Sequence, residues 1–306
     1  MNYAKIIADA WNVASENRKI VWFAFVPSFV TVVVFVIEII WQYFLISESL
    51  GIYKSGFVFG KIGDIISLIS DKNLLGISIF FVVFVLIFTF LTPPWIEATM
   101  ILSTHHHIKS PEKRFSLRKK VIEGFNHFFQ LFKLHSALSP FSVLSVTFLG
   151  LTLFRYLKGE LFSEILLPTL IIYGIICLFL SFFFHLAPYF IIHDDQNFGQ
   201  AIRSSISLSF MYFGSVFGLS ILMLLVNIRV ILNVLVVLGI PVLAASLTTY
   251  FAGSDYLNII YILAGILGVG LIGLSSYLTG ILEVFSVAFW NQAYFMLKAK
   301  DEETEL

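Results

Sequence analysis

The sequence predicts an all-α fold, a polytopic bundle of transmembrane helices. The chain is 58% hydrophobic and 12% charged, and its mean hydropathy of +0.93 lies far outside the range of soluble globular proteins. Several apolar runs also exceed the roughly 20 residues that a helix needs to cross a hydrocarbon core. The net charge is zero, so we expect no nucleic-acid partner, and the lone Cys177 cannot form an internal disulfide.

Four apolar runs are predicted to span the membrane, at residues 20–43, 74–101, 137–157 and 165–192. No short apolar segment with a small-residue cleavage site precedes the first run, so we expect it to be a permanent span. After Tyr212 about 85 residues stay apolar, and either two long interrupted helices or four short ones fit there. The first choice gives six spans and the second gives eight. We favour six, because the runs between the weak breaks at Asn227 and at residues 273–280 are short for full crossings.

Lysine and arginine are distributed unevenly between the predicted loops. Residues 1–19, 101–135, 193–211 and 296–306 carry 13 of them, whereas residues 46–73, 154–165 and 250–257 carry 5. Positive loops stay in the cytoplasm, so we place the first set there. The prediction is a multi-pass protein of the cell membrane with both termini in the cytoplasm.

A short pattern recurs before each odd-numbered span, at residues 7–12, 121–126 and 202–207. It reads apolar, two variable positions, small, large apolar, small polar. We infer one domain over residues 1–300, built from three units at about 1–101, 115–192 and 197–298, with residues 301–306 as a short acidic tail. Each unit would be a cytoplasmic interfacial helix followed by a transmembrane hairpin. Chance similarity among apolar helices is the competing explanation of the repeat.

The second copy of this pattern is predicted to form an amphipathic helix at the membrane interface. Its apolar residues recur with helical spacing, at Val121, Phe125, Phe128, Phe129 and Phe132. Nearby basic residues could contact anionic lipid, each contributing on the order of 1 kcal/mol. These residues are Lys113, Arg114, Arg118, Lys119 and Lys120. Their role in setting the topology would also account for the charge.

Four stretches of the chain carry a family signature. They are SLRKKVIEGF, APYFIIHDDQNFGQ, AIRSSISLSFMYFGSVFGLSILMLL and FSVAFWNQAYFMLKAK. Together they resemble the membrane domain attached to some glycerophosphoryl diester phosphodiesterases, a domain that also occurs in many uncharacterised prokaryotic multi-pass membrane proteins. The resemblance covers most of residues 1–300. It implies a helical multi-pass domain and little about activity, because the catalytic domain of those enzymes is separate and soluble.

Ionisable residues within apolar runs are costly, so they are the best functional pointers. Glu97 and His185 each lie eight residues before the histidine that ends their span, so we expect them at matching depth and able to pair. Arg229 and Glu283 are a second expected pair, in the final hairpin. Most pairs of this kind only neutralise each other and fix the register of the two helices. That structural role is the commoner alternative to a functional intramembrane site.

Small residues four positions apart occur three times in the last third of the chain and permit close helix contact. The pairs are Gly214 and Gly218, Ala264 and Gly268, and Ser276 and Gly280. The glycine series from Gly265 to Gly273 also suits a flexible or broken helix of the kind that transporters use.

Adjacent histidines at His105, His106 and His107, with His193, are weak candidates for a metal site. Consecutive helical residues point about 100° apart, so three neighbours do not converge by themselves. We therefore expect an interfacial polar cap, no metal and no cofactor. The chain has no zinc-helix, nucleophile-elbow or phosphate-loop motif, which argues against an enzyme.

Three functions fit these features. The first, which we favour, is a non-enzymatic membrane protein that binds lipid, a protein partner or a second copy through its cytoplasmic interfacial helices. The second is a transporter of a small solute or lipid that uses the intramembrane polar residues. The third is a membrane-embedded lipid hydrolase that depends on the histidines.

Overall fold

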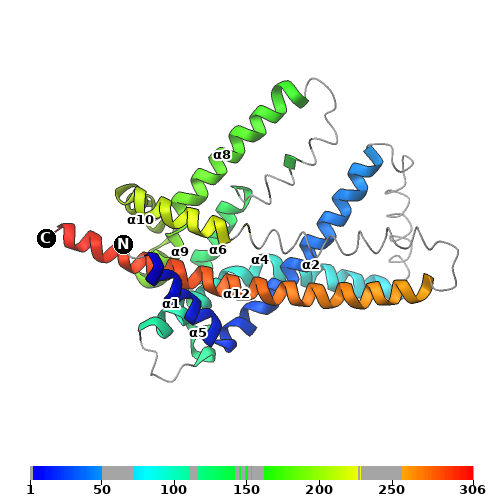
Figure 1. The fold of residues 1–306 in the computed structure, drawn as a ribbon, viewed down its shortest axis with the longest axis horizontal. Helices are drawn as coiled ribbons and strands as arrows, with labels where there is room; N and C mark the ends of the chain where they lie inside the picture. The colour runs from blue at the N-terminus through cyan, green and yellow to red at the C-terminus, as the bar shows by residue number, and fades with distance from the viewer. Residues whose placement is uncertain are drawn as a thin grey trace. The chain divides into compact units, whose positions relative to one another are not determined.

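The computed structural model describes residues 3–49, 72–109, 116–141, 145, 149–150, 153, 162–226, 228 and 257–305 (Figure 1). These residues form helices and short connections without any strand, which confirms the all-α prediction for them. By length and composition, two described stretches could each cross a membrane, Glu164–His193 and Gly265–Glu303. The number rises to as many as four if two bent helix pairs each count as one span.

The helices divide into two compact units. Unit 1 comprises Met1–Val33, Ile96–Asn126 and Leu208–Leu306. Unit 2 comprises Val34–Trp95 and His127–Ser207.

Unit 1 begins with an amphipathic helix, α1 (Tyr3–Glu16), that lies along α12 (Leu257–Glu305) (Figure 1). It buries Ile6, Ala10 and Val13, which recur at three- and four-residue intervals and so form one stripe. Asn17 then interrupts the helix, and the chain turns by 84° into α2 (Arg18–Ser49). A helix that buries one face and turns sharply into an apolar helix has the local form expected of an interfacial segment before a span.

The second predicted span lies within α4 (Lys72–Lys109), and the later part of the basic segment after it lies in α5 (Leu117–Asn126). The single amphipathic helix predicted from Val121 to Phe132 is wrong, because α5 ends at Asn126 and α6 (Phe128–Leu138) begins after a turn at His127. Gly124 and Asn126 have low helix propensity, which favours a break near this point. The predicted apolar stripe is therefore divided between the two units.

In unit 2, α6 leads into η1 (Ser139–Phe141), and η2 (Phe162–Leu166) leads into α8 (Leu167–Phe184). Most of the third predicted span, 137–157, falls outside the described residues. The fourth predicted span is helical but not continuous: a turn at residues 185–186 separates α8 from α9 (Ala187–His193). Pro188 accounts for this break, because it has no amide hydrogen and its ring clashes with the preceding turn.

The last third contains α10 (Phe198–Met211), a helix over Phe213–Val226 that is bent by 100° from α10, and α12. Residues 229–256 are outside the described part, so the choice between six and eight spans stays a prediction. The broken-helix alternative for the glycine series is wrong, since α12 runs through Gly265 and Gly273 without a break. At 1.5 Å per residue α12 is roughly 74 Å long, which exceeds a hydrocarbon core of about 30 Å.

The three small-residue pairs differ in what they contact. A Cβ on Gly280 would lie 3.2 Å from the backbone nitrogen of Phe25, so α12 and α2 approach closely there, as predicted. A Cβ on Gly218 would lie 3.3 Å from the hydroxyl of Tyr3, whereas Gly214 and Gly268 face no described atom within 4 Å.

Candidate functional site

Helix α5 exposes one face that carries both positive charge and large apolar side chains. Arg118, Lys119, Ile122 and Phe125 are all exposed, and they fall within about 120° of arc around the helix axis. The exposed fractions are 76% for the Lys119 side chain, 61% for Ile122 and 57% for Phe125. The basic residues occupy the start of this face and the apolar ones its end, so the α5 face, defined by these four residues, is amphipathic along its length.

The opposite face of α5 is fixed to α4 by a glycine. Gly124 is buried, and a Cβ there would lie 2.7 Å from Thr99 Oγ1 and 3.0 Å from the Thr99 backbone nitrogen. Only a residue without a side chain allows the two backbones to approach this closely. The α5 face is thus held on a long apolar helix with its charges directed outward.

The structure narrows the set of predicted lipid contacts. Lys113 and Arg114 lie outside the described residues. The Nζ of Lys120 is 2.6 Å from Glu123 Oε2, so this half-buried lysine is engaged within α5. Arg118 and Lys119 remain as the outward cations, since the Lys119 Nζ is 3.9 Å from Glu123 Oε1 and its side chain is mostly exposed.

A polar cluster lies inside unit 1, where α2, α4 and α12 contribute one residue each. The buried Ser28 donates a hydrogen bond of 3.0 Å from Oγ to Glu283 Oε2. Glu97 on α4 lies within electrostatic range of Glu283. Two of the carboxyl groups singled out from the sequence are therefore within electrostatic range of each other, and Ser28 is the hydrogen-bond partner of Glu283.

The two predicted pairs, Glu97 with His185 and Glu283 with Arg229, stay predictions. Arg229, the expected partner of Glu283, lies outside the described residues. His185, the expected partner of Glu97, occupies the turn between α8 and α9 and belongs to unit 2, whereas Glu97 belongs to unit 1.

Nearer the end of α4, a buried amide joins α12 to α4. Asn291 Nδ2 donates to the carbonyl oxygen of Ile101 and to Thr104 Oγ1, both at 3.0 Å. Ser103 Oγ and Gln292 Nε2 are also buried and make no hydrogen bond within the described part of the chain. The two hydrogen bonds of Asn291 therefore join α12 to α4 at this end of unit 1.

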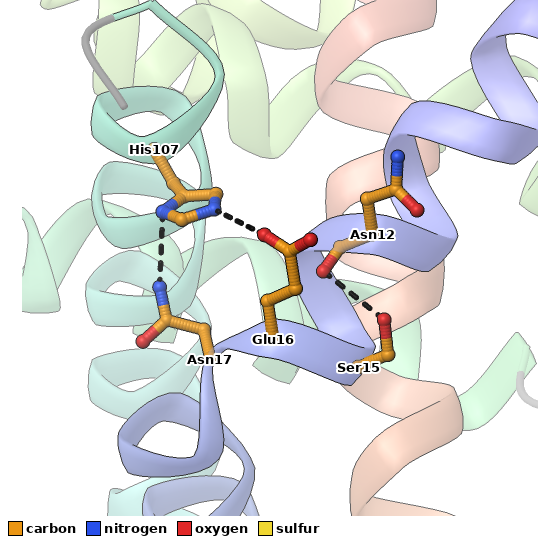
Figure 2. Close-up of polar contacts among 5 residues, drawn as sticks. All are labelled: Asn12, Ser15, Glu16, Asn17 and His107. Carbon is orange, nitrogen blue, oxygen red and sulfur yellow. Dashed lines mark hydrogen bonds and ion pairs between the residues drawn. The ribbon is translucent and has the colours of Figure 1, made fainter. Parts of the chain in front are cut away.

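His107 on α4 contacts the point where α1 turns into α2 (Figure 2). Asn17 Nδ2 donates to His107 Nδ1 at 3.1 Å, and His107 Nε2 lies 3.9 Å from Glu16 Oε2.

The three adjacent histidines point to different surroundings. The ring of His105 stacks on Phe295 of α12, with centroids 4.6 Å apart. Burial lowers the pKa of His105 from its ordinary 6.5, and the positive charges of Lys109 and Lys120 lower it further. Among the described residues, no three histidine, cysteine, aspartate or glutamate side chains are grouped closely enough to hold a metal ion, and His193 belongs to unit 2.

The sequence reasoning missed the neutral members of these clusters. Ser28, Thr104 and Asn291 carry no charge, so a search for ionisable residues within apolar runs does not find them. A useful signal was present, since Asn291 and Gln292 interrupt the aromatic stretch near the end of the last predicted span. Polar amides in such a position are costly unless they bond across helices.

The chain was also compared with other proteins. No protein-family model, no curated protein and no solved structure matches it.

Proposed function

We propose that this chain is a non-enzymatic multi-pass membrane protein that binds anionic lipid head groups through the α5 face. The observation that carries the proposal is the combination of exposed Arg118 and Lys119 with exposed Ile122 and Phe125 on one side of a helix fixed to α4. Anionic lipid offers negative phosphate next to hydrocarbon, which matches this order of side chains.

The proposed topology follows the sequence. Six spans in three hairpins, with both termini in the cytoplasm, agree with the distribution of lysine and arginine. The sharp turns that follow α1 and α10 support this arrangement, because an interfacial helix has to turn before it enters the bilayer. The α5 face would then lie at the cytoplasmic surface, where anionic lipids are found. Kinship with the phosphodiesterase-associated membrane domain is proposed on the same motifs as before.

The test compares charge reversal on α5 with charge reversal elsewhere. Native mass spectrometry of the purified full chain in detergent counts adducts of phosphatidylglycerol and of phosphatidylcholine. The wild type should prefer phosphatidylglycerol, and the double variant Arg118→Glu with Lys119→Glu should lose about tenfold or more of that preference, because each basic residue near the surface contributes about 1 kcal/mol.

Lys133→Glu on α6 is the matched control, since this exposed lysine lies on another helix. It should leave the lipid preference unchanged. Circular dichroism and gel filtration establish that each variant is folded. A double variant that is folded and keeps the full preference for phosphatidylglycerol would refute the α5 face as the lipid site.

A second candidate is proton-coupled transport, favoured by one observation, the cluster of Glu97, Glu283 and Ser28. Carboxyl groups inside an apolar helix bundle are rare, and they commonly mark the paths of protons and other cations. The same residues would then alternate between loaded and empty states during transport.

This candidate is tested in proteoliposomes that contain a pH-sensitive dye. Wild-type protein should conduct or exchange protons under an imposed gradient, and Glu283→Gln should abolish the flux. Ser275→Ala, at a buried hydroxyl two turns earlier on α12, serves as the control. Equal flux in wild type, Glu283→Gln and protein-free vesicles would exclude this function and leave the lipid-binding proposal untouched.

A further inference from the structure

Helix α2 begins with an exposed ridge of two cations followed by large apolar side chains. The α2 ridge consists of Arg18, Lys19, Trp22, Val26 and Phe29, all of which are exposed. These residues fall within about 100° of arc around the helix axis. The exposed fractions are 59% for Trp22, 48% for Val26 and 40% for Phe29. The charge therefore lies at the start of the ridge, and apolar surface follows it.

The other side of α2 is packed inside unit 1. Ala24 and Ser28 are buried, and Ser28 donates its hydrogen bond to Glu283 of α12. A Cβ on Gly280 of α12 would lie 3.2 Å from the backbone nitrogen of Phe25. These contacts fix the rotation of α2 about its own axis, so the ridge is turned outward.

The two cations of the ridge are available for a ligand. Neither Arg18 nor Lys19 forms an ion pair with a described carboxylate. Glu16 is the acidic residue nearest to them in the chain, and its carboxylate lies 3.9 Å from His107 instead. Two adjacent, exposed positive charges without such a partner are suited to an external anion.

Trp22 lies one turn beyond the cations. Its ring packs against Phe25 and Tyr277, with centroids 5.3 Å and 6.0 Å away, and more than half of the residue is still exposed. Tryptophan favours the boundary between lipid head groups and hydrocarbon, because its ring is apolar and its N–H is a donor. Phe29 lies about 16 Å beyond Arg18 along the helix axis, roughly half of a hydrocarbon core. The ridge is therefore long enough to follow a phospholipid from its phosphate into its acyl chains.

The ridge has the same order of side chains as the α5 face. Arg18 and Lys19 precede Trp22 with the spacing at which Arg118 and Lys119 precede Ile122. The two helices differ in length, because α5 ends at Asn126 whereas α2 continues to Ser49. The start of each helix thus suits the same head-group chemistry, and α2 alone extends the apolar part far enough to line a whole acyl chain.

We propose that the α2 ridge is a second binding site for anionic phospholipid. Arg18 and Lys19 hold the phosphate, Trp22 lies at the boundary, and Val26 and Phe29 contact the acyl chains. The site rests on the proposed multi-pass topology, and it acts independently of the α5 face. Its two cations favour phosphatidylglycerol over phosphatidylcholine, because the choline group of the latter carries a positive charge that cancels the phosphate.

Fluorescence quenching by brominated lipid tests the site on the full chain reconstituted into vesicles. Bromine on the acyl chains quenches a tryptophan that it contacts, and the difference between the wild type and Trp22→Phe isolates the emission of Trp22. Brominated phosphatidylglycerol or brominated phosphatidylcholine replaces part of the phosphatidylcholine in the vesicles. In the wild type, half of the quenching should need about tenfold less of the brominated phosphatidylglycerol, because both cations favour the anionic lipid.

Two matched variants separate the α2 ridge from the α5 face. Arg18→Gln with Lys19→Gln removes both charges and leaves Trp22 in place, so the two brominated lipids should quench equally. Arg118→Gln with Lys119→Gln removes the same charge from α5 and should leave the preference at Trp22 unchanged. Circular dichroism and gel filtration establish that both variants are folded.

Four results would each overturn the α2 site. Equal quenching by both lipids in the wild type means contact without head-group recognition. No quenching by either lipid means that another occupant, such as a second copy of the chain, covers the ridge. A preference that survives in Arg18→Gln with Lys19→Gln excludes these cations, and a preference that the α5 variant removes belongs to α5.

The two lipid proposals fail separately. Native mass spectrometry counts lipids that stay bound in detergent and tests the α5 face. Quenching reports lipids that exchange beside Trp22 in a bilayer and tests the α2 ridge.

Discussion

The two units of the chain bury different kinds of side chain. Of the ten buried polar side chains among the described residues, nine lie in unit 1 and only Ser205 lies in unit 2. Unit 2 instead contains α8, which exposes a series of large apolar residues on several faces, including Ile171, Ile175 and Phe179. The difference indicates that unit 1 is specified by polar contacts between its helices, whereas α8 is suited to an apolar surrounding on most sides.

Both units also place an imidazole near a carboxylate beside a helix break. In unit 1 His107 faces Glu16 and accepts a hydrogen bond from Asn17. In unit 2 His127 Nδ1 lies 3.8 Å from Asp195 Oδ1, where Asp195 is 86% exposed and has a left-handed backbone. Both carboxylates are mostly exposed, 69% for the Glu16 side chain and 86% for that of Asp195, so each contact contributes little to stability.

The largest effect should come from removing the buried amide of unit 1. Asn291→Ala deletes two hydrogen bonds to α4 and should lower the free energy of unfolding by about 2 kcal/mol. Ser205→Ala in unit 2 deletes one, to the carbonyl oxygen of Phe183, and should cost about half as much. Unfolding by sodium dodecyl sulfate in mixed micelles measures both variants. Equal losses of stability in the two variants would show that polar contacts do not stabilise unit 1 more than unit 2.

A second effect tests the close approach of α5 to α4. In Gly124→Ala the new methyl group meets Thr99 at 2.7 Å and 3.0 Å, so we expect a loss of about 1 to 2 kcal/mol. Gly199→Ala on α10 is the matched change in unit 2, where no described atom lies within 4 Å, and it should change stability by less than about 0.5 kcal/mol. The same unfolding assay applies. Tolerance of Gly124→Ala would mean that α5 is not held on α4.

A smaller effect should appear as the pH falls. The folded protein keeps His105 neutral more strongly than the unfolded chain, whose pKa is 6.5, so the unfolded state binds its proton first. Stability should therefore decrease as pH drops below about 6.5, until the folded protein is protonated as well. His105→Phe keeps a ring against Phe295 and should flatten this part of the pH profile. If the stability of His105→Phe varies with pH as that of the wild type does, other titratable groups cause the pH dependence.

The smallest effect compares two glycines on α12. Gly268→Ala faces no described atom within 4 Å and should stabilise the helix by about 0.5 to 1 kcal/mol through higher helix propensity. Gly280→Ala gains the same propensity but pushes on the Phe25 backbone, so its net effect should be zero or unfavourable. Stabilisation by both changes would show that α12 and α2 separate without cost.

Local patterns in the sequence determined the helical class, several helix positions and the amphipathic character of α1 and α5. These features depend on residues a few positions apart in the chain, so hydropathy and periodicity reveal them directly. The same patterns missed the breaks at His127 and at residues 185–186, although Gly124 and Pro188 supply the local reason for each.

Only the tertiary structure decided which polar residues meet. The sequence marked Glu97, Glu283 and the three histidines as notable, but it assigned other partners to the glutamates and grouped His107 with its neighbours and His193. The contacts of Glu283 with Ser28 and of His107 with Glu16 join positions 255 and 91 residues apart. Apolar helices offer many faces of nearly equal hydropathy, so periodicity shows which side of a helix is polar and cannot show which helix it packs against. That choice depends on close approach at sites such as Gly124 and Gly280 and on buried donors such as Asn291, and these become visible only when the helices are placed together.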